Sequence, residues 1–100
     1  MLNIAAGDLG ASAAKKYDIE AWFPGQGAYR EITSTSNTTD FQARRLEVRV
    51  RGEGGNRPVH TLNGTLCAMS RTIIALMENG QQEDGSIDWP PILKKYRAAP

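Results

Sequence analysis

The chain has 100 residues, a formal net charge of +1 and 40% hydrophobic residues, which is typical of one small folded domain. This charge balance excludes a global electrostatic attraction to nucleic acid or to a membrane surface. One cysteine, Cys67, excludes an internal disulfide framework, and no apolar run approaches the ~20 residues of a membrane helix. A cytoplasmic location without membrane contact is therefore expected.

The N-terminal third is predicted to form strands. Residues 2–6 are a short apolar run, which indicates a buried strand, and residues 10–16 indicate a loop or a helical turn. Apolar and polar residues alternate over 18–23, as in a half-buried strand. Pro24 to Gly27 is a turn signal, so residues 28–34 are expected to return as the second strand of a hairpin.

The middle of the chain combines a short helix with a second pair of strands. Thr39 to Gln42 has the spacing of a capping box, which predicts a helix through about Arg45. Residues 46–51 alternate as a strand, and residues 59–62 are predicted to be its partner. The intervening residues 52–58 are polar and glycine-rich, so a mobile loop is expected there.

The stretch from Leu66 to Met77 is an apolar helical pattern broken by one charge, Arg71, with Gly80 as the expected C-cap. A helix that is apolar almost all round is expected to be buried, and its guanidinium with it. Because burying an unpaired cation costs several kcal/mol, Arg71 is expected to meet an anion. The helix alone leaves open whether this anion is a neighbouring carboxylate or a phosphate.

Residues 81–86 are predicted to form a turn, and Pro90-Pro91 are predicted to stop regular structure before a last segment, 92–96. Locally paired strands with one long helix indicate an α+β fold. We expect an antiparallel β-sheet with the helix packed on it, and residues 1–100 forming a single unit.

Several polar residues allow more than one interpretation. Glu31 and Ser34 lie three apart, so a strand places them on opposite faces unless a bulge or the strand's end intervenes. Taken alone, Glu31 is interpreted as a solvated or cross-strand-paired carboxylate, and Thr65 as a helix N-cap. His60, in a predicted strand, has no partner at metal-ligand spacing and is interpreted as structural, so zinc is not expected.

Five segments, in this order, carry a resemblance: AAKKYDIEAWFP, YREITSTSN, DFQARR, HTLNGT and ENGQQEDG. Together they resemble the seryl-tRNA synthetase family of class II aminoacyl-tRNA synthetases, from about Asn3 to Tyr96, and residues 62–93 look like motif 3. The resemblance implies the C-terminal portion of the class II catalytic domain. The family's helical arm, its motif 1 and its motif 2 arginine are then expected outside these 100 residues.

The resemblance also implies an activity. The family is an ATP-dependent ligase that activates serine as seryl-adenylate and transfers it to tRNA(Ser), using ATP and Mg²⁺. The complete enzyme is expected to be a homodimer, and these 100 residues alone are expected to be inactive. Two alternatives remain open: a non-catalytic nucleotide-binding or interaction module derived from this domain, and an amino acid:carrier-protein ligase.

By this resemblance, Arg71 is the catalytic arginine that grips the ATP phosphates. The ATP-binding set is Glu31, Ile32, Thr33, Ser34 and Arg71; Glu31 and Ser34 are expected to ligate Mg²⁺, and Thr65 and Asn63 to bind serine. Thr33 and Thr35 stand where many members of the family have serine and cysteine. A basic cluster of Arg44, Arg45, Arg49 and Arg51 is interpreted as a solvated face rather than as a contact to tRNA.

Overall fold

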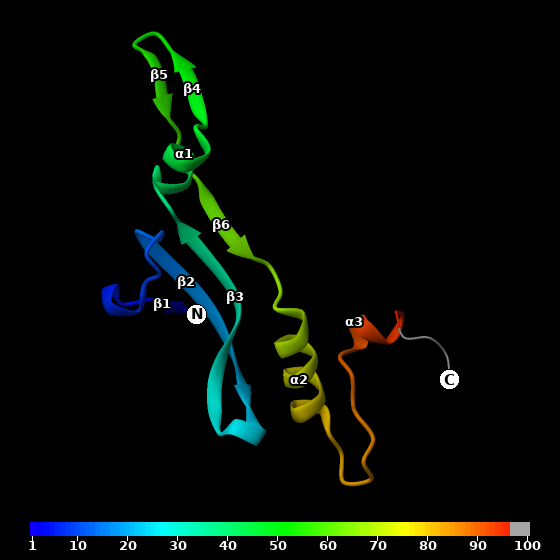
Figure 1. Cartoon of the computed structure of the whole chain (residues 1–100). Helices are drawn as coiled ribbons and strands as arrows, with labels where there is room; N and C mark the ends of the chain where they lie inside the picture. The colour runs from blue at the N-terminus through cyan, green and yellow to red at the C-terminus, as the bar shows by residue number, and fades with distance from the viewer. Residues whose placement is uncertain (97–100) are drawn as a thin grey trace.

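The computed structural model describes residues 1–96, which form a twisted antiparallel sheet with one helix beside it and a hairpin arm beyond one end (Figure 1). The sheet has four strands in the order β1-β2-β3-β6, and β4 pairs with β5 in the arm. The elements in chain order are β1 (Leu2–Asn3), η1 (Ala6–Asp8), β2 (Lys15–Phe23), η2 (Pro24–Gln26), β3 (Ala28–Asn37), α1 (Phe41–Leu46), β4 (Arg49–Gly52), β5 (Gly55–Pro58), β6 (Leu62–Thr65), α2 (Met69–Gly80) and α3 (Pro91–Lys94).

The centre of the sheet is the long hairpin of β2 and β3, which confirms the hairpin predicted from the sequence. Its turn is η2, which ends at Gly27 with φ 58°, a left-handed conformation that glycine adopts without strain. Phe23, at the end of β2, has an exposed fraction of only 1%. The class of fold is therefore the predicted one: α+β, with an antiparallel sheet.

A bulge interrupts the pairing of the hairpin. Ile19 pairs with Thr33 and Glu20 pairs with Glu31, so Ile32 is an extra residue in β3 with no partner in β2. An extra residue shifts the side-chain alternation of one strand relative to the other. The bulge therefore decides which residues of β3 share a face.

Two predictions for the N-terminal segment are wrong. The expected strand over residues 2–6 is limited to β1, whose two residues are exposed, and the chain turns into η1 directly afterwards. The predicted loop over 10–16 ends early, because Lys15 and Lys16 already belong to β2. The pairing of β2 with β3 thus extends the strand past its hydrophobic pattern.

The short helix α1 lies where it was expected, but the capping box does not form. Asp40 is the N-cap and makes no side-chain capping hydrogen bond. The residues before the helix are fixed differently, through Thr38, which is 1% exposed. The carbonyl of Thr38 accepts a hydrogen bond from the N–H of Phe41, and the N–H of Thr38 donates to the carbonyl of Thr61. Side-chain capping is therefore replaced by a backbone turn and by a hydrogen bond to Thr61, a distant residue of the same chain.

The predicted pairing of the middle strands is also wrong. Residues 52–58 are not a loop, because β5 returns directly along β4 through a two-residue turn at Glu53 and Gly54. Residues 59–62 are consequently free to leave the arm, and β6 pairs with β3 instead. The glycine-rich turn closes the hairpin earlier than the strand pattern indicated.

Helix α2 begins at Met69, three residues later than predicted, and includes Gly80, so Gln81 is its C-cap. Leu66 is 93% exposed, and Cys67 also precedes the helix. The prediction of a buried helix is wrong: Ala75 is its only buried residue, and Arg71 is exposed. The reason is orientation, since the polar side of α2 faces the hairpin.

Contacts along α2 show this orientation. Arg71 donates to the carbonyl oxygen of Glu31, and the carboxylate of Glu78 accepts from the backbone N–H of Gly25 at 3.0 Å. Asn79 donates to the carbonyl of Trp22 at 2.9 Å. The opposite, apolar side of α2 is directed away from the sheet and contains the exposed side chains of Met69, Ile73 and Met77.

The turn predicted over 81–86 is confirmed by the hydrogen bond from Gln82 to the carbonyl of Ser86. The expectation that Pro90-Pro91 stop regular structure is wrong in part, because α3 begins at Pro91. Proline is favoured at the first position of a helix, where its missing N–H is not needed. Within the described residues, no helix has both the length and the apolar character required to cross a bilayer.

We expect the 100-residue chain to self-associate when it is purified. Its radius of gyration is 19.4 Å, against about 13 Å for a compact domain of this length, and large apolar side chains are exposed on α2 and at the sheet edge β6. Exposed edges and apolar patches favour pairing with another chain. Sedimentation velocity over a concentration series checks this, and one monomeric species at the highest concentration would contradict it.

Candidate functional site

One face of the sheet gathers polar side chains from three strands, and we call it the polar face. Cross-strand partners share a face, and the partners are Lys16 with Ser36, Asp18 with Ser34, and Glu20 with Glu31. The strand β6 adds Thr65 opposite Ser34 and Asn63 opposite Ser36. Its members are Lys16, Asp18, Glu20, Glu31, Ser34, Ser36, Asn63 and Thr65.

The bulge at Ile32 brings Glu31 and Ser34 to the polar face together. The sequence required either a bulge or the end of the strand for this, and the register confirms the bulge. Ile32 itself serves the architecture: its carbonyl accepts a hydrogen bond from the N–H of Ala68 at 2.8 Å, which fixes the start of α2 beside β3. Thr33, opposite Ile19, points to the other face.

A three-residue ion network lies next to Glu31. The Lys16 ammonium contacts Asp18 Oδ2 at 2.9 Å and Glu31 Oε2 at 3.0 Å. These hydrogen bonds, to Asp18 first and Glu31 second, raise the pKa of Lys16 above its ordinary value. The hydrogen bond from Lys16 lowers the pKa of Glu31, and the positive charge of Arg71 acts in the same direction. Glu31 is therefore held as a carboxylate.

Asp18 is the buried member of this network. Its exposed fraction is 4%, and its second oxygen, Oδ1, has no hydrogen-bond partner within residues 1–96. A buried carboxylate oxygen without a partner costs free energy, so this atom calls for an explanation such as a ligand, an ion or a functional role. Sequence analysis missed Lys16 and Asp18. Their signal is the alternation of charged residues along a strand that also contains Ile19 and Phe23.

Arg71 reaches across from α2 to the same strand. Its Nη1 donates to the backbone carbonyl of Glu31 at 2.8 Å, and no carboxylate lies within ion-pair distance of it in the described part of the chain. This contact uses one nitrogen of the guanidinium and fixes its direction, while the exposed remainder stays available to another acceptor. The anion expected at Arg71 is thus not a neighbouring carboxylate.

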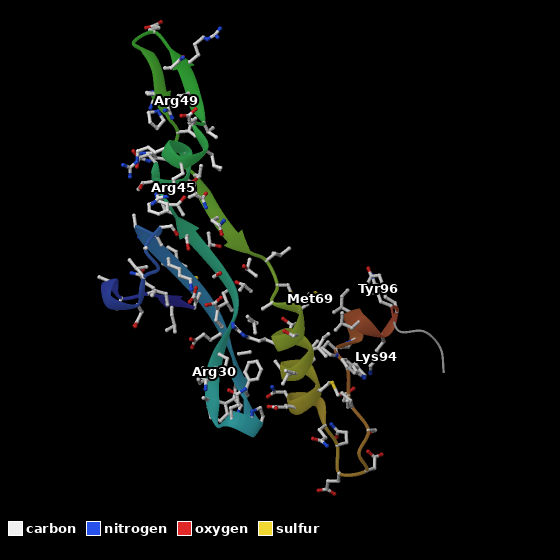
Figure 2. All side chains as sticks on the ribbon, in the orientation of Figure 1. Arg30, Arg45, Arg49, Met69, Lys94 and Tyr96 are labelled. Carbon is white, nitrogen blue, oxygen red and sulfur yellow. The ribbon has the colours of Figure 1, made fainter. Side chains whose placement is uncertain are left out.

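Arg71 and Glu31 also line an open cleft of about 450 Å³ between α2 and the hairpin. Arg30 on the hairpin (Figure 2), which donates to Gln26 at 2.8 Å, lines the same cleft. Two guanidinium groups beside two carboxylates suit a phosphate that is accompanied by a cation. The lining residues are Glu20, Phe23, Gln26, Tyr29, Arg30, Glu31, Arg71 and Ile74.

Thr65 and Asn63 belong to a strand and not to a helix start. The alternative reading of Thr65 as an N-cap is wrong, because Ala68 occupies that position in α2. Thr65 lies in β6, directly opposite Ser34, and is exposed. A hydroxyl there can face a small polar ligand on the polar face.

The donors expected for Mg²⁺ are compatible with a cation that arrives on phosphates. Within residues 1–96 no group of three or more His, Cys, Asp or Glu residues could hold a metal ion. Glu31 and Ser34 share a face and supply hard oxygen donors, and Mg²⁺ commonly takes one or two protein ligands with phosphates and water completing its shell. These residues therefore fit a nucleotide-borne Mg²⁺ better than a dedicated metal cage.

The basic cluster lies on α1 and on β4 of the arm (Figure 2). Its arginines make local contacts: Arg44 pairs with Asp40, and Arg45 stacks over the ring of Phe41 at 3.7 Å. Arg49 donates to the carbonyl of Ala43 at 3.5 Å. His60 is exposed and lies between β5 and β6, so its predicted place in a strand is wrong.

The fold agrees with comparisons to known proteins. The profile of the family described as tRNA synthetase class II core domain (G, H, P, S and T) matches residues 1–80. The chain belongs to this class II core domain family. Among its relatives, the serine–tRNA ligase of Acidothermus cellulolyticus is 62% identical over 96 residues, and that of Streptomyces coelicolor is 58% identical.

Solved structures support the same relationship. Seryl-tRNA synthetase from Pyrococcus horikoshii, complexed with ATP, superimposes with a TM-score of 0.86 at 58% identity over 94% of this chain. The cytoplasmic serine–tRNA ligase from Naegleria fowleri, in complex with AMP, gives a TM-score of 0.82 at 46% identity. The chain spans 22% of each of these structures and 23% of the two relatives above.

Proposed function

We propose that these 100 residues are a segment of a seryl-tRNA synthetase catalytic domain, and that the polar face forms part of its ATP and serine site. The observation that carries this proposal is the bulge at Ile32. It brings Glu31 and Ser34 onto one face, opposite Thr65, while Arg71 is hydrogen-bonded to the same strand. The relatives' complexes with ATP and AMP support a nucleotide at this site.

In the proposed reaction, the carboxylate of serine attacks the α-phosphate of ATP and expels pyrophosphate, which gives seryl-adenylate. The protein's part is to position the reactants and to balance the charge that develops on the phosphates. Mg²⁺, when bound, supplies charge neutralisation on the phosphate oxygens. Transfer to tRNA(Ser), homodimer formation and a cytoplasmic location belong to the same proposal.

Five residues of the site have a defined task in this scheme. Arg71, directed by the carbonyl of Glu31, offers its remaining N–H groups to the phosphates. Glu31 and Ser34 would supply oxygens to hold the cation. Thr65 forms a hydrogen bond with the serine hydroxyl, and Asn63 lies on the same face of β6. A pocket that hydrogen-bonds a hydroxyl rejects substrate analogues that lack the hydroxyl.

We expect the full-length protein that contains this segment to catalyse serine-dependent exchange of pyrophosphate into ATP, and to charge tRNA(Ser). The 100-residue chain alone is expected to show no exchange near that rate, since groups that act as a unit fail together. Exchange assays with serine, alanine and threonine measure both points. Nucleotide binding without exchange by the full-length protein would favour a binding module. Transfer of the amino acid to a carrier protein in place of tRNA would favour the carrier-protein ligase.

A further inference from the structure

The ion network on the polar face contains two residues to which the proposed function gives no task. Lys16 joins Asp18 and Glu31, and its side chain is 23% exposed, against 6% for Asp18 and 31% for Glu31. Asp18 is thus the buried carboxylate of the network, Glu31 is the more exposed one, and the Lys16 ammonium lies between them.

Glu31 needs this contact in order to stay where it is. Its direct cross-strand partner is Glu20, a like charge on the same face, and like charges directly opposite each other are unfavourable. Within residues 1–96, Lys16 is the only cation that contacts the Glu31 carboxylate, because Arg71 contacts the backbone carbonyl instead. Without the ammonium, repulsion from Glu20 would turn the carboxylate away.

Asp18 in turn fixes the ammonium. Lysine has a flexible four-carbon stem, so its position depends on an anchored partner. Asp18 provides that anchor through Oδ2 at 2.9 Å, within a strand that is paired on both sides, by β1 and by β3. The position of the buried Asp18 carboxylate therefore fixes the ammonium of Lys16, and the ammonium in turn fixes the half-buried carboxylate of Glu31.

We propose that Lys16, anchored on Asp18, is a positioning residue for Glu31. It holds Oε2, so that Oε1 would be available to the cation that accompanies ATP. This inference rests on the proposed function, and it assigns a task to two residues of β2 that act through Glu31. Partners of this kind orient metal-ligating groups, and their loss typically weakens metal affinity by about 10–100-fold.

The test uses the full-length protein and measures ATP binding by calorimetry over a Mg²⁺ series. Lys16→Met is expected to raise the Mg²⁺ concentration at half-maximal binding by about tenfold or more. Binding should recover at saturating Mg²⁺. Asp18→Asn, which keeps the shape and an oxygen acceptor, is expected to shift the midpoint in the same direction by a smaller factor.

Lys15→Met is the matched control. Lys15 is the neighbouring lysine of β2, but it lies over the ring of Tyr17 and pairs with Asn37, so alternation places it on the opposite face. This variant removes the same charge and should leave the Mg²⁺ midpoint unchanged. An equal shift in Lys15→Met would show that net charge, and not position, is responsible, and would overturn the inference.

A purely structural role for Lys16 predicts a different pattern, in which Lys16→Met lowers the melting temperature while the Mg²⁺ midpoint stays the same. That result overturns the inference. If Lys16→Met does not fold, an unchanged midpoint in folded Asp18→Asn overturns it equally. A wild-type protein that fails to bind ATP at any Mg²⁺ concentration contradicts the proposed function itself, whereas normal wild-type binding with unshifted variants contradicts only the role of Lys16.

Discussion

Arg71→Ala in the full-length protein is expected to reduce serine-dependent pyrophosphate exchange by two to three orders of magnitude. Losing one well-placed donor to a developing charge typically costs ~3–4 kcal/mol of transition-state stabilisation. Arg71→Lys should restore little of this rate, because an ammonium cannot both hold the carbonyl of Glu31 and present a planar pair of N–H groups. Exchange rates for the three proteins at equal ATP and serine concentrations measure the effect.

The same substitution separates a phosphate contact from a structural role. Arg71 is exposed and makes one hydrogen bond to a backbone carbonyl, so its removal should reduce the free energy of unfolding by only about 1–2 kcal/mol. Thermal melting of the same variant provides this control. A large fall in melting temperature with nearly normal exchange at low temperature would contradict the phosphate role.

The sequence predicted the elements with local signals. The hairpin of β2 and β3 followed from alternation on both sides of Pro24 to Gly27, and α1 and the turn over 81–86 followed from their own residues. Local reasoning also showed that Glu31 and Ser34, three apart, can share a face only if a bulge or the strand's end intervenes, and the register of the hairpin has the bulge.

What failed depends on contacts between distant segments. The partner of β6 is β3, which lies far earlier in the chain, and nothing in residues 59–65 indicates that choice over the nearer β4. The burial of α2 was predicted from its apolar content, yet the hydrogen bonds of Arg71, Glu78 and Asn79 place its polar side against the hairpin. Polar contacts to backbone groups of another element leave no periodic pattern in the sequence.

The candidate site shows the same division. Motif resemblance pointed to Arg71, Glu31, Ser34 and Thr65. The structure places Glu31 and Ser34 on β3 and Thr65 on β6, and Arg71 reaches β3 from α2. Resemblance could not indicate Lys16 or Asp18, because their importance lies in the distances that join them to Glu31. Thr33 was included through its place in the motif, and the bulge turns it to the other face.

Phe23→Ala is expected to give the largest loss of stability among single substitutions in this segment. Phe23 is 1% exposed and, with Thr38, is one of the two largest fully buried side chains in the described chain. Truncating a buried phenylalanine removes its transfer free energy and leaves a cavity, which costs ~3–5 kcal/mol. A total stability of about 5–15 kcal/mol is typical, so the loss is a large fraction of it. Chemical denaturation of the full-length protein, followed by tryptophan fluorescence, measures the change.

The adjacent aromatic residue supplies the control. Trp22 is 42% exposed and stacks edge-on against Tyr29 with ring centroids 5.3 Å apart, so Trp22→Ala removes a larger side chain that is already partly in water. The loss in free energy of unfolding for Trp22→Ala should be about 1–2 kcal/mol, clearly below that for Phe23→Ala. Because Trp22→Ala removes a fluorophore, its unfolding is followed by circular dichroism. Phe23 also lines the cleft that contains Glu31 and Arg71, at the point where η2 meets the end of α2. Equal losses of free energy of unfolding in the two variants would mean that the burial of Phe23 does not anchor the hairpin. The position of the cleft would then depend on the hydrogen bonds of Glu78 and Asn79 alone.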